Sequence, residues 1–513
     1  MKKKTMSIVV AVIFFTIGVC LMFACGSCKE SNTGKKNNYV NSIYLTDYVE
    51  TLEGEKLSAF ELEGNNRMVS SEGSIAVSAY YTAKADGKEA YTYMITTAEA
   101  LTRPHSITFL DVSEDKFAGG GTVEMEITAN FPITTAIVLP QNLGITPIVS
   151  GNTIKFSVDK YGSYTVIVDD YRNPDKAYTV FVRPPEQVEV PDGYTLIEYK
   201  AGLHFADEIT LKSNTVLYLH AGAFIVAKPT GGNSAYIKAN AVENVKIVGH
   251  GVIDMSQINW HGKMGIDITN GKNIEVNGIT LINSSTWTMR FLYCENVSVK
   301  DCVIFGYRQN SDAYAICSSK NVLVKDCFAR SGDDLFEVKT YNTPATDITF
   351  ENCVAWPDNC RGFGIIQETV SDIENITYKN CSLLYQLKDW SEHMAAFVIT
   401  AGEQGNVKNV VFENCDLFYS KVFAIRLSIG ENAETTGLTG FNNKIIGVIF
   451  KNCNFVHPSS SRGIIKFRNN TNDANGINGI VFDNVIFQGE RLSSIAQINP
   501  VYEGDAPTDI TIK

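Results

Sequence analysis

A short pattern recurs nine times in the second half of the chain, and it constrains the fold more than any other feature of the sequence. The first copy reads Asn-Val-Lys-Ile-Val-Gly from Asn244, and the copies follow at intervals of roughly 23 to 38 residues, the range in which repeat architectures occur. Within each copy apolar residues occupy alternate positions, as expected for a strand with one buried face. The copies start at Asn244, Asn273, Asn296, Asn321, Asp347, Asn375, Asn409, Gly447 and Gly479.

The residues that follow each start predict a bend and a buried column. Gly, Asn or Asp, which tolerate left-handed backbone angles, stands five positions after every start. The next position is cysteine in six copies, which predicts an inward-facing stack of thiols, with disulfides as the alternative in an exported protein. The pattern indicates an all-β fold, a right-handed parallel β-helix with strands about 4.8 Å apart. The bend positions are Gly249, Gly278, Asp301, Asp326, Asn352, Asn380, Asn414, Asn452 and Asn484, and the cysteines are Cys302, Cys327, Cys353, Cys381, Cys415 and Cys453.

Residues 39–185 have a different pattern. Short alternating runs, such as the one from Thr153 to Val158, are separated by Gly, Asn and Asp turns, which is typical of a small antiparallel β-sandwich. Prolines 184 and 185 mark its end. We therefore expect the sandwich to precede a β-helix catalytic domain over residues 186–513.

The N-terminus has the features of a lipoprotein signal peptide. Three lysines precede an apolar run from about Ile8 to Met22, and Cys25 follows a small residue. We expect a signal peptide over residues 1–24, lipidation of Cys25 and a flexible polar tether over residues 25–38. This predicts an exported protein, lipid-anchored to the bacterial cell envelope at the outer membrane or cell surface, that meets the membrane only through its anchor. An uncleaved membrane anchor is the alternative.

Charge and histidine spacing exclude several partners. A formal net charge of −12 argues against nucleic acid and weakly against a strongly anionic polymer. His250, His261 and His393 lack ligand spacing with other His or Cys residues, so we expect no metal site and no cofactor. We expect the protein to act as a monomer.

Two acidic fragments lie one repeat apart, Asn310-Ser311-Asp312 and Gly332-Asp333-Asp334. Aligning the strands that follow them places Asp312 beneath Asp334, with Asp333 beside them. Clustered carboxylates raise a pKa, which suits a reaction that needs one protonated acid and one ionised base. Neighbouring rungs allow about 5 to 9 Å between such groups, overlapping the ~6.5–9.5 Å of inverting glycosidases. The alternative is that they are ordinary acidic loop residues.

These fragments carry a resemblance. Together with the run from Asn283 to Thr288 and with Lys339, they are similar in order and spacing to glycoside hydrolase family 28, the polygalacturonases. The front domain, with Leu143–Pro147 and Gly162–Val166, resembles the β-sandwich of family 49 dextranases, which belong to the same clan. The resemblance implies an inverting glycoside hydrolase with Asp333 as general acid and with Asp312 and Asp334 activating water.

The chain also departs from family 28. Gly362-Phe363-Gly364 stands where the family has Gly-His-Gly, and Arg426-Leu427-Ser428 keeps the arginine of Arg-Ile-Lys but loses the lysine. Because the resemblance implies that this arginine and lysine bind a uronate, the substrate is expected to differ from polygalacturonate. The expected substrate-binding residues are Arg426, Lys339, Phe363, Asn310 and His393. Phe363 would raise the pKa of a neighbouring carboxylic acid or stack on a sugar ring, with plain loop packing as the alternative, and His393 would replace the missing imidazole.

The predicted function is therefore hydrolysis of an extracellular polysaccharide or oligosaccharide. Two other classes stay open. One is a polysaccharide lyase that uses Ca²⁺, and the other is a catalytically silent glycan-binding β-helix protein.

Overall fold

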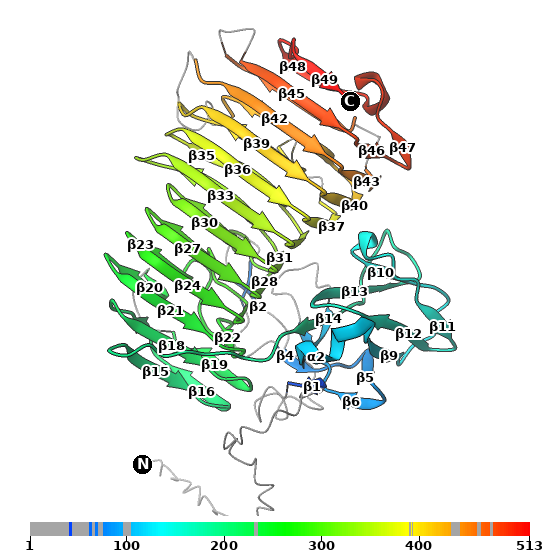
Figure 1. Ribbon diagram of the computed structural model, residues 1–513, viewed down its shortest axis with the longest axis vertical. Helices are drawn as coiled ribbons and strands as arrows, with labels where there is room; N and C mark the ends of the chain where they lie inside the picture. The colour runs from blue at the N-terminus through cyan, green and yellow to red at the C-terminus, as the bar shows by residue number, and fades with distance from the viewer. Residues whose placement is uncertain are drawn as a thin grey trace, which may run out of the picture. The chain divides into compact units, whose positions relative to one another are not determined.

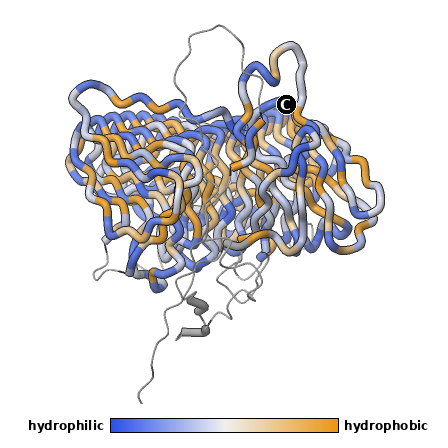
Figure 2. The backbone as a smooth tube through the Cα atoms, turned by 90° about the horizontal axis from the view of Figure 1, so that it is seen from below, coloured by the Kyte–Doolittle hydropathy of each residue, from blue (hydrophilic) through white to orange (hydrophobic). Residues whose placement is uncertain are grey.

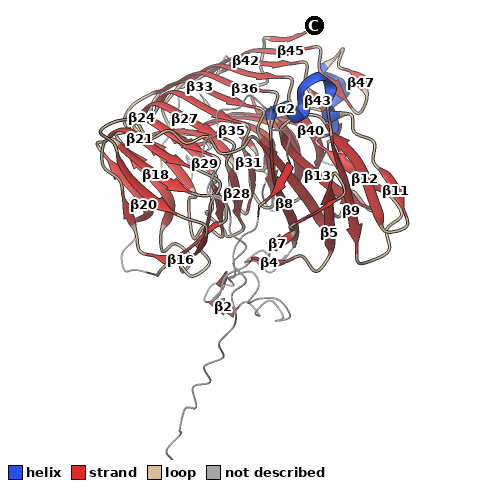
Figure 3. Ribbon diagram, turned by 60° about the horizontal axis from the view of Figure 1, so that its bottom comes forward, coloured by secondary structure: helices blue, strands red, loops and turns tan. Residues whose placement is uncertain are grey.

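The computed structural model describes the chain with interruptions. The described residues are 40–43, 61–63, 67–69, 75–95, 104–229, 234–388, 391, 393–431, 442–458, 463–471 and 476–513. The predicted signal peptide, Cys25 and the tether lie outside them. Strands dominate what is described (Figure 3). No helix in this part of the chain is long and apolar enough to cross a membrane.

From Thr195 onward the chain winds into a right-handed parallel β-helix, and each full coil adds a strand to three sheets (Figure 1). The first sheet contains β15 (Thr195–Tyr199), β18 (Thr215–Leu219), β21 (Glu243–Val248), β24 (Lys272–Asn277), β27 (Glu295–Lys300), β30 (Lys320–Lys325), β33 (Ala345–Glu351), β36 (Ile373–Lys379), β39 (Val407–Glu413), β42 (Ile445–Lys451), β45 (Ile477–Asp483) and β49 (Ile510–Ile512). The second contains β16 (Gly202–Ala206), β19 (Ala223–Ala227), β22 (Val252–Asp254), β25 (Thr280–Ile282), β28 (Val303–Gly306), β31 (Phe328–Ser331), β34 (Val354–Pro357), β37 (Ser382–Gln386), β40 (Asp416–Ser420), β43 (Asn454–His457), β46 (Ile486–Phe487) and β47 (Glu490–Arg491). The third contains β17 (Ile209–Thr210), β20 (Ala235–Asn240), β23 (Met264–Thr269), β26 (Met289–Leu292), β29 (Tyr314–Cys317), β32 (Phe336–Thr340), β35 (Phe363–Thr369), β38 (Ala395–Ala401), β41 (Phe423–Ile429), β44 (Ile465–Asn469) and β48 (Val501–Gly504).

The preceding β-sandwich has two sheets, and its pairs are antiparallel except for β8 and β14, which run parallel. One sheet contains β1 (Val40–Ser42), β4 (Ile75–Val77), β7 (Tyr93–Ile95), β8 (His105–Val112), β10 (Ala136–Leu139), β13 (Gly162–Val168) and β14 (Ala177–Arg183). The other contains β5 (Tyr81–Ala85), β6 (Lys88–Ala90), β9 (Val123–Ala129), β11 (Ile148–Ser150) and β12 (Thr153–Val158). A separate hairpin is formed by β2 (Glu61–Glu63) and β3 (Arg67–Val69), and the described helical turns are α2 (Glu114–Phe117), η1 (Ala118–Gly120), η2 (Gln141–Leu143) and η3 (Ile495–Ile498).

The predicted bend residues adopt left-handed backbone angles. The Asp and Asn members have φ between 51° and 55°, and Gly249 and Gly278 have φ of 112° and 82°. In most coils the side chain donates to the residue one coil earlier, as Asn380 Nδ2 does to Asn352 Oδ1 at 3.1 Å. We call this row the turn ladder: Asp301, Asp326, Asn352, Asn380, Asn414, Asn452 and Asn484.

The interior of the helix is a set of stacked columns. The six predicted cysteines are buried free thiols, so the stack is confirmed and the disulfide alternative is wrong for them. A second column stacks Tyr314, Phe336, Phe363 and Phe397, with centroid distances of 4.8, 5.0 and 5.9 Å. Apolar and polar residues alternate along the strands, which lets one face fill this interior (Figure 2).

The β-sandwich packs on the second sheet. Phe181 of β14 lies edge-on to Phe328 of β31 with centroids 5.1 Å apart, inside an apolar cluster shared by both domains. Beside it, Arg330 bonds His105 Nδ1 at 2.9 Å and forms two hydrogen bonds with Asp358. Because Arg330 stands three residues before Asp333, this contact braces the strand that leads into the acidic loop.

Candidate active site

Three consecutive coils place polar loops between the second and third sheets. Asp312 lies between β28 and β29, Asp333 and Asp334 lie between β31 and β32, and Arg361 lies between β34 and β35. The strands after these loops are in register, with Tyr314 paired to Phe336 and Ala313 N donating to Asp334 O at 2.8 Å. Asp312 therefore lies one rung from Asp334, as the alignment of the repeats predicts.

Small residues bring the two acidic loops into contact. A Cβ atom on Gly332 would lie 2.7 Å from the carbonyl oxygens of Tyr307 and Arg308, so only glycine fits there. The hydroxyl oxygens of Ser311 and Ser331 lie 2.7 Å apart, and both lie within hydrogen-bond distance of the carbonyl of Gly306. These contacts hold the two loops that carry the acids against each other.

Asp333 is the partly exposed member of the trio. Its Oδ2 accepts from Asn310 N at 2.7 Å, and its Oδ1 accepts from Asp334 N at 3.0 Å. Burial and the charge of Asp334 raise its pKa above the usual aspartate range. The side chain of Asn310, predicted to bind substrate, is partly exposed and bonds His261 Nε2 at 2.9 Å.

Asp334 is buried, with an exposed fraction of 2%, and an arginine holds it. Arg361 donates to it from its backbone N and from Nη1, both at 2.9 Å. Such a double contact fixes the orientation of the Asp334 side chain.

Asp312 is equally buried and pairs with Lys339 Nζ at 3.4 Å. Burial, helped by the charges of Asp333 and Asp334 and opposed by Lys339, raises its pKa to about 8. One carboxylate oxygen of each of Asp312, Asp334 and Glu337 lies within 4.8 Å of the others.

Lys339 lies among three carboxyl groups, those of Asp312, Glu337 and Glu368. Its ammonium lies 3.2 Å from Glu337 Oε2 and 3.1 Å from Glu368 Oε2, and 4.6 Å from the ring centroid of Trp287. Burial raises the pKa of Glu337 well above its usual range, although Lys339 opposes the shift. This shift favours the protonated form of Glu337.

The predicted substrate ligands Arg426 and His393 both meet Glu431. Arg426 is buried and bonds Glu431, while His393 Nδ1 lies 2.5 Å from Glu431 Oε1. Burial would raise the pKa of Glu431, but Arg426 and His393 hold it far below its usual range. Arg426 thus has its charge compensated inside the protein, whereas the His393 side chain stays 39% exposed. Glu431 also lies 3.7 Å from Arg361, which links this group to Asp334.

The expectation that Phe363 stacks on a sugar ring is wrong. Its ring is fully buried in the interior column between Phe336 and Phe397, so it cannot stack on a sugar. The neighbouring Gly364 faces outward instead, paired between Glu337 and Val398.

Two groups among the described residues bring three metal-ligand atoms together: Asp312, Asp334 and Glu337, and Asp333, Asp334 and Cys360. Their carboxylates already pair with Lys339 and Arg361, which competes with a metal ion for the same oxygens.

Four charged residues of the site are not identifiable from the sequence motifs: Arg361, Glu337, Glu368 and Glu431. Strand alternation gives a signal for Glu337, which shares the outward face of β32 with Lys339. Arg361 and Glu431 stand in loops of irregular length, where no periodicity marks them.

Comparisons with known proteins identify the family of the chain. Residues 183–504 match the family described as glycosyl hydrolases family 28. An exopolygalacturonase of Arabidopsis thaliana is 24% identical over 130 residues, 24% of this chain and 30% of that protein, so the match spans about a third of that relative.

Solved structures extend the comparison to the front domain. Dex49A from Penicillium minioluteum is 13% identical, with 88% of this chain and 97% of that chain covered and a TM-score of 0.63, which shows a shared fold. A hyperthermoactive exopolygalacturonase from Thermotoga maritima is 17% identical, with 58% and 85% covered and a TM-score of 0.45. Since the family match covers well over half of the chain, this protein belongs to glycosyl hydrolases family 28.

Proposed function

We propose that the protein is an inverting glycoside hydrolase that cuts a neutral extracellular polysaccharide or oligosaccharide. One observation carries the proposal: a partly exposed carboxyl group with a raised pKa, Asp333, stands beside two buried carboxyl groups, Asp312 and Asp334. Acid and base functions need carboxyl groups in environments that separate their pKa values.

In the proposed reaction Asp333 donates its proton to the glycosidic oxygen as the bond to the anomeric carbon breaks. A water molecule attacks that carbon and gives a proton to the carboxylate of Asp334. Asp334 is assigned as the acceptor because it is held in place by two hydrogen bonds from Arg361, and Asp312 lies beside it one rung away. The proton lost by Asp333 is replaced from solvent.

Charge supports a neutral substrate. Three described cations lie near the acids: Lys339, Arg361 and Arg426. Each of them contacts at least one carboxylate, and six carboxyl groups lie around the three cations. A uronate would add further negative charge without a free cation among these three to receive it. The six are Asp312, Asp333, Asp334, Glu337, Glu368 and Glu431.

The test is Asp333→Asn against a panel of neutral and acidic polysaccharides, with new reducing ends as the readout. Loss of the general acid should lower kcat by about 10²–10⁴-fold, and less for an aryl glycoside whose leaving group needs no proton. The exposed Asp505→Asn should leave the rate unchanged. Wild-type rates in Asp333→Asn would remove this residue from the mechanism.

The configuration of the wild-type product tests the inverting mechanism, and the pH profile of activity tests the role of Asp333 as proton donor. The first product anomer seen by NMR should have inverted configuration, and activity should fall as pH rises through the pKa of Asp333, since the donor must be protonated. An unsaturated product that absorbs ultraviolet light and disappears with a chelator would indicate a lyase instead. Binding without any new reducing ends would indicate a silent glycan-binding protein.

We also propose that the protein acts outside the cytoplasm, anchored through a lipid on Cys25. The basic, apolar and cysteine-containing N-terminus supports this. Cells fed a radiolabelled fatty acid should label the wild-type protein but not Cys25→Ser, with Cys294→Ser, a buried thiol, as the control. Equal labelling of Cys25→Ser would contradict the anchor.

A further inference from the structure

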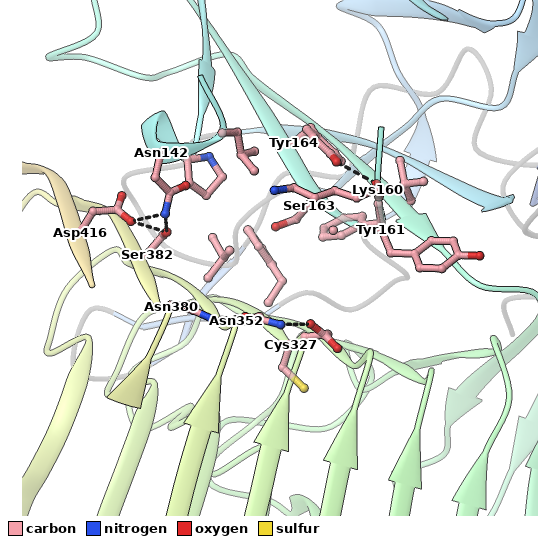
Figure 4. Close-up of a pocket in the computed structure, with 18 of the residues that line it drawn as sticks. Asn142, Lys160, Tyr161, Ser163, Tyr164, Cys327, Asn352, Asn380, Ser382 and Asp416 are labelled. Carbon is pink, nitrogen blue, oxygen red and sulfur yellow. Dashed lines mark hydrogen bonds between the residues drawn. The ribbon is translucent and has the colours of Figure 1, made fainter. Parts of the chain in front are cut away.

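A cavity of about 480 Å³ lies between the β-sandwich and the turn ladder (Figure 4). Asn142 and Ser163 line it from the sandwich, and the ladder residues from Asp301 to Asn452 line it from the helix. Its volume falls within the ~300–1,000 Å³ of ligand pockets.

The cavity is separate from the acids. Phe328, at the start of β31, lines it, whereas Asp333 follows the end of the same strand. The chain between these two residues spans at most about 18 Å. The β-sandwich therefore covers a strand that has this cavity at one end and the acids at the other.

The side chains that line the cavity suit a ligand rich in hydroxyl groups. Each ladder amide, such as Asn380 or Asn414, uses one N–H and its oxygen within the ladder and keeps a second N–H. These donors recur at the rung spacing of about 4.8 Å. Val303, Phe328 and Val354 supply an apolar floor.

A buried acceptor stands at one end. Asp416, 4% exposed, accepts with Oδ1 from Asn142 Nδ2 and from Ser382 Oγ, both at 2.7 Å (Figure 4). Its Oδ2 is buried and has no hydrogen-bond partner among the described residues. A ligand hydroxyl would satisfy this oxygen, because buried polar atoms are costly to leave unpaired.

We propose that this cavity is a second, non-catalytic binding site for a short stretch of neutral glycan. Asp301, Asp326 and Asp416 line it, against Lys160 and an Arg183 that already lies 3.6 Å from Asp111, so an anionic chain is disfavoured. Only the choice of a glycan as ligand rests on the proposed function. A polymer held here and in the acidic site would bind more tightly than either site allows alone.

The test measures binding by calorimetry, using the full chain carrying Asp333→Asn so that no sugar is hydrolysed. The probes are cellotetraose, maltotetraose, isomaltotetraose and tetragalacturonate. At least one neutral probe should bind at two sites per chain. Adding Ser163→Trp, which fills the cavity, should remove one site, while Ser157→Trp on the exposed face of β12 should keep both.

Asp416→Asn is the second variant, since its amide oxygen can still accept from Asn142 and Ser382. It should weaken the cavity site at least fivefold without lowering the melting temperature. The inference is overturned if no neutral probe loses a site in Ser163→Trp, if Asp416→Asn binds with unchanged affinity, or if tetragalacturonate is the preferred ligand. Loss of a site in the Asp333→Asn background, together with no new reducing ends from the wild-type chain, refutes only the hydrolase. Two unchanged sites together with hydrolysis by the wild-type chain refute only this cavity site.

Discussion

At the scale of single residues, Lys339 is the cation on which the buried acids depend. It is 2% exposed and contacts Asp312, Glu337 and Glu368. Lys339→Met would leave the buried Asp312 and Glu337 without this cation, and losing one partner of a buried pair costs about 3–5 kcal/mol. We expect the free energy of unfolding, measured by urea denaturation, to fall by that order.

A surface lysine provides the matched control for this substitution. Lys320 pairs with Glu295 at 3.4 Å, but its side chain is 60% exposed. Lys320→Met should therefore change the unfolding free energy by less than about 1 kcal/mol. Equal losses in the two variants would show that Lys339 has no special part in the site.

At the scale of the coil, the turn ladder contains one defect that the structure makes testable. Asn352 donates to Asp326 at 2.8 Å, but Asp326 as a carboxylate cannot donate to Asp301 one coil earlier. Burial and the charge of Asp326 raise the pKa of Asp301 to about 7. Asp326→Asn removes the repulsion and completes the ladder, so we expect the unfolding free energy to rise by about 1 kcal/mol.

The comparison for this variant is Asp347→Asn. Asp347 belongs to a second row of residues with left-handed backbone angles, which stand at the starts of the repeats. Asp347 accepts from Asn375 at 3.0 Å and is exposed, with Asn321 rather than an acid one coil earlier. Replacing it relieves no repulsion, so its effect on the melting temperature should be smaller. A larger gain from Asp347→Asn than from Asp326→Asn would contradict the explanation by like charges.

The coil is also the scale that the sequence predicts best. Bend residues and cysteines recur at fixed offsets, so the β-helix, its buried thiols and the adjacency of Asp312 and Asp334 follow from the spacing of residues alone. Arg361 has no such offset because its loop differs from those of other coils. The expectation that Phe363 binds a sugar follows its place in a family motif, whereas the structure pairs it with Phe336 in the interior.

At the scale of the whole molecule, buried carboxyl groups make stability depend on pH. Burial raises the pKa of Asp301 and Asp416 to about 7 and that of Asp312 to about 8, from the usual aspartate value of 3.8. The folded chain therefore binds more protons than the unfolded chain between about pH 4 and pH 8, so this part of its stability is complete below pH 3.8 and is lost as pH rises through 7 to 8. The net charge of −12 adds repulsion in the same direction.

The melting temperature should be higher at about pH 5 than at about pH 9, and Asp416→Asn, which cannot titrate, should narrow the difference. A melting temperature that is equal or higher at the alkaline pH would show that these carboxyl groups are ionised in the folded chain without cost.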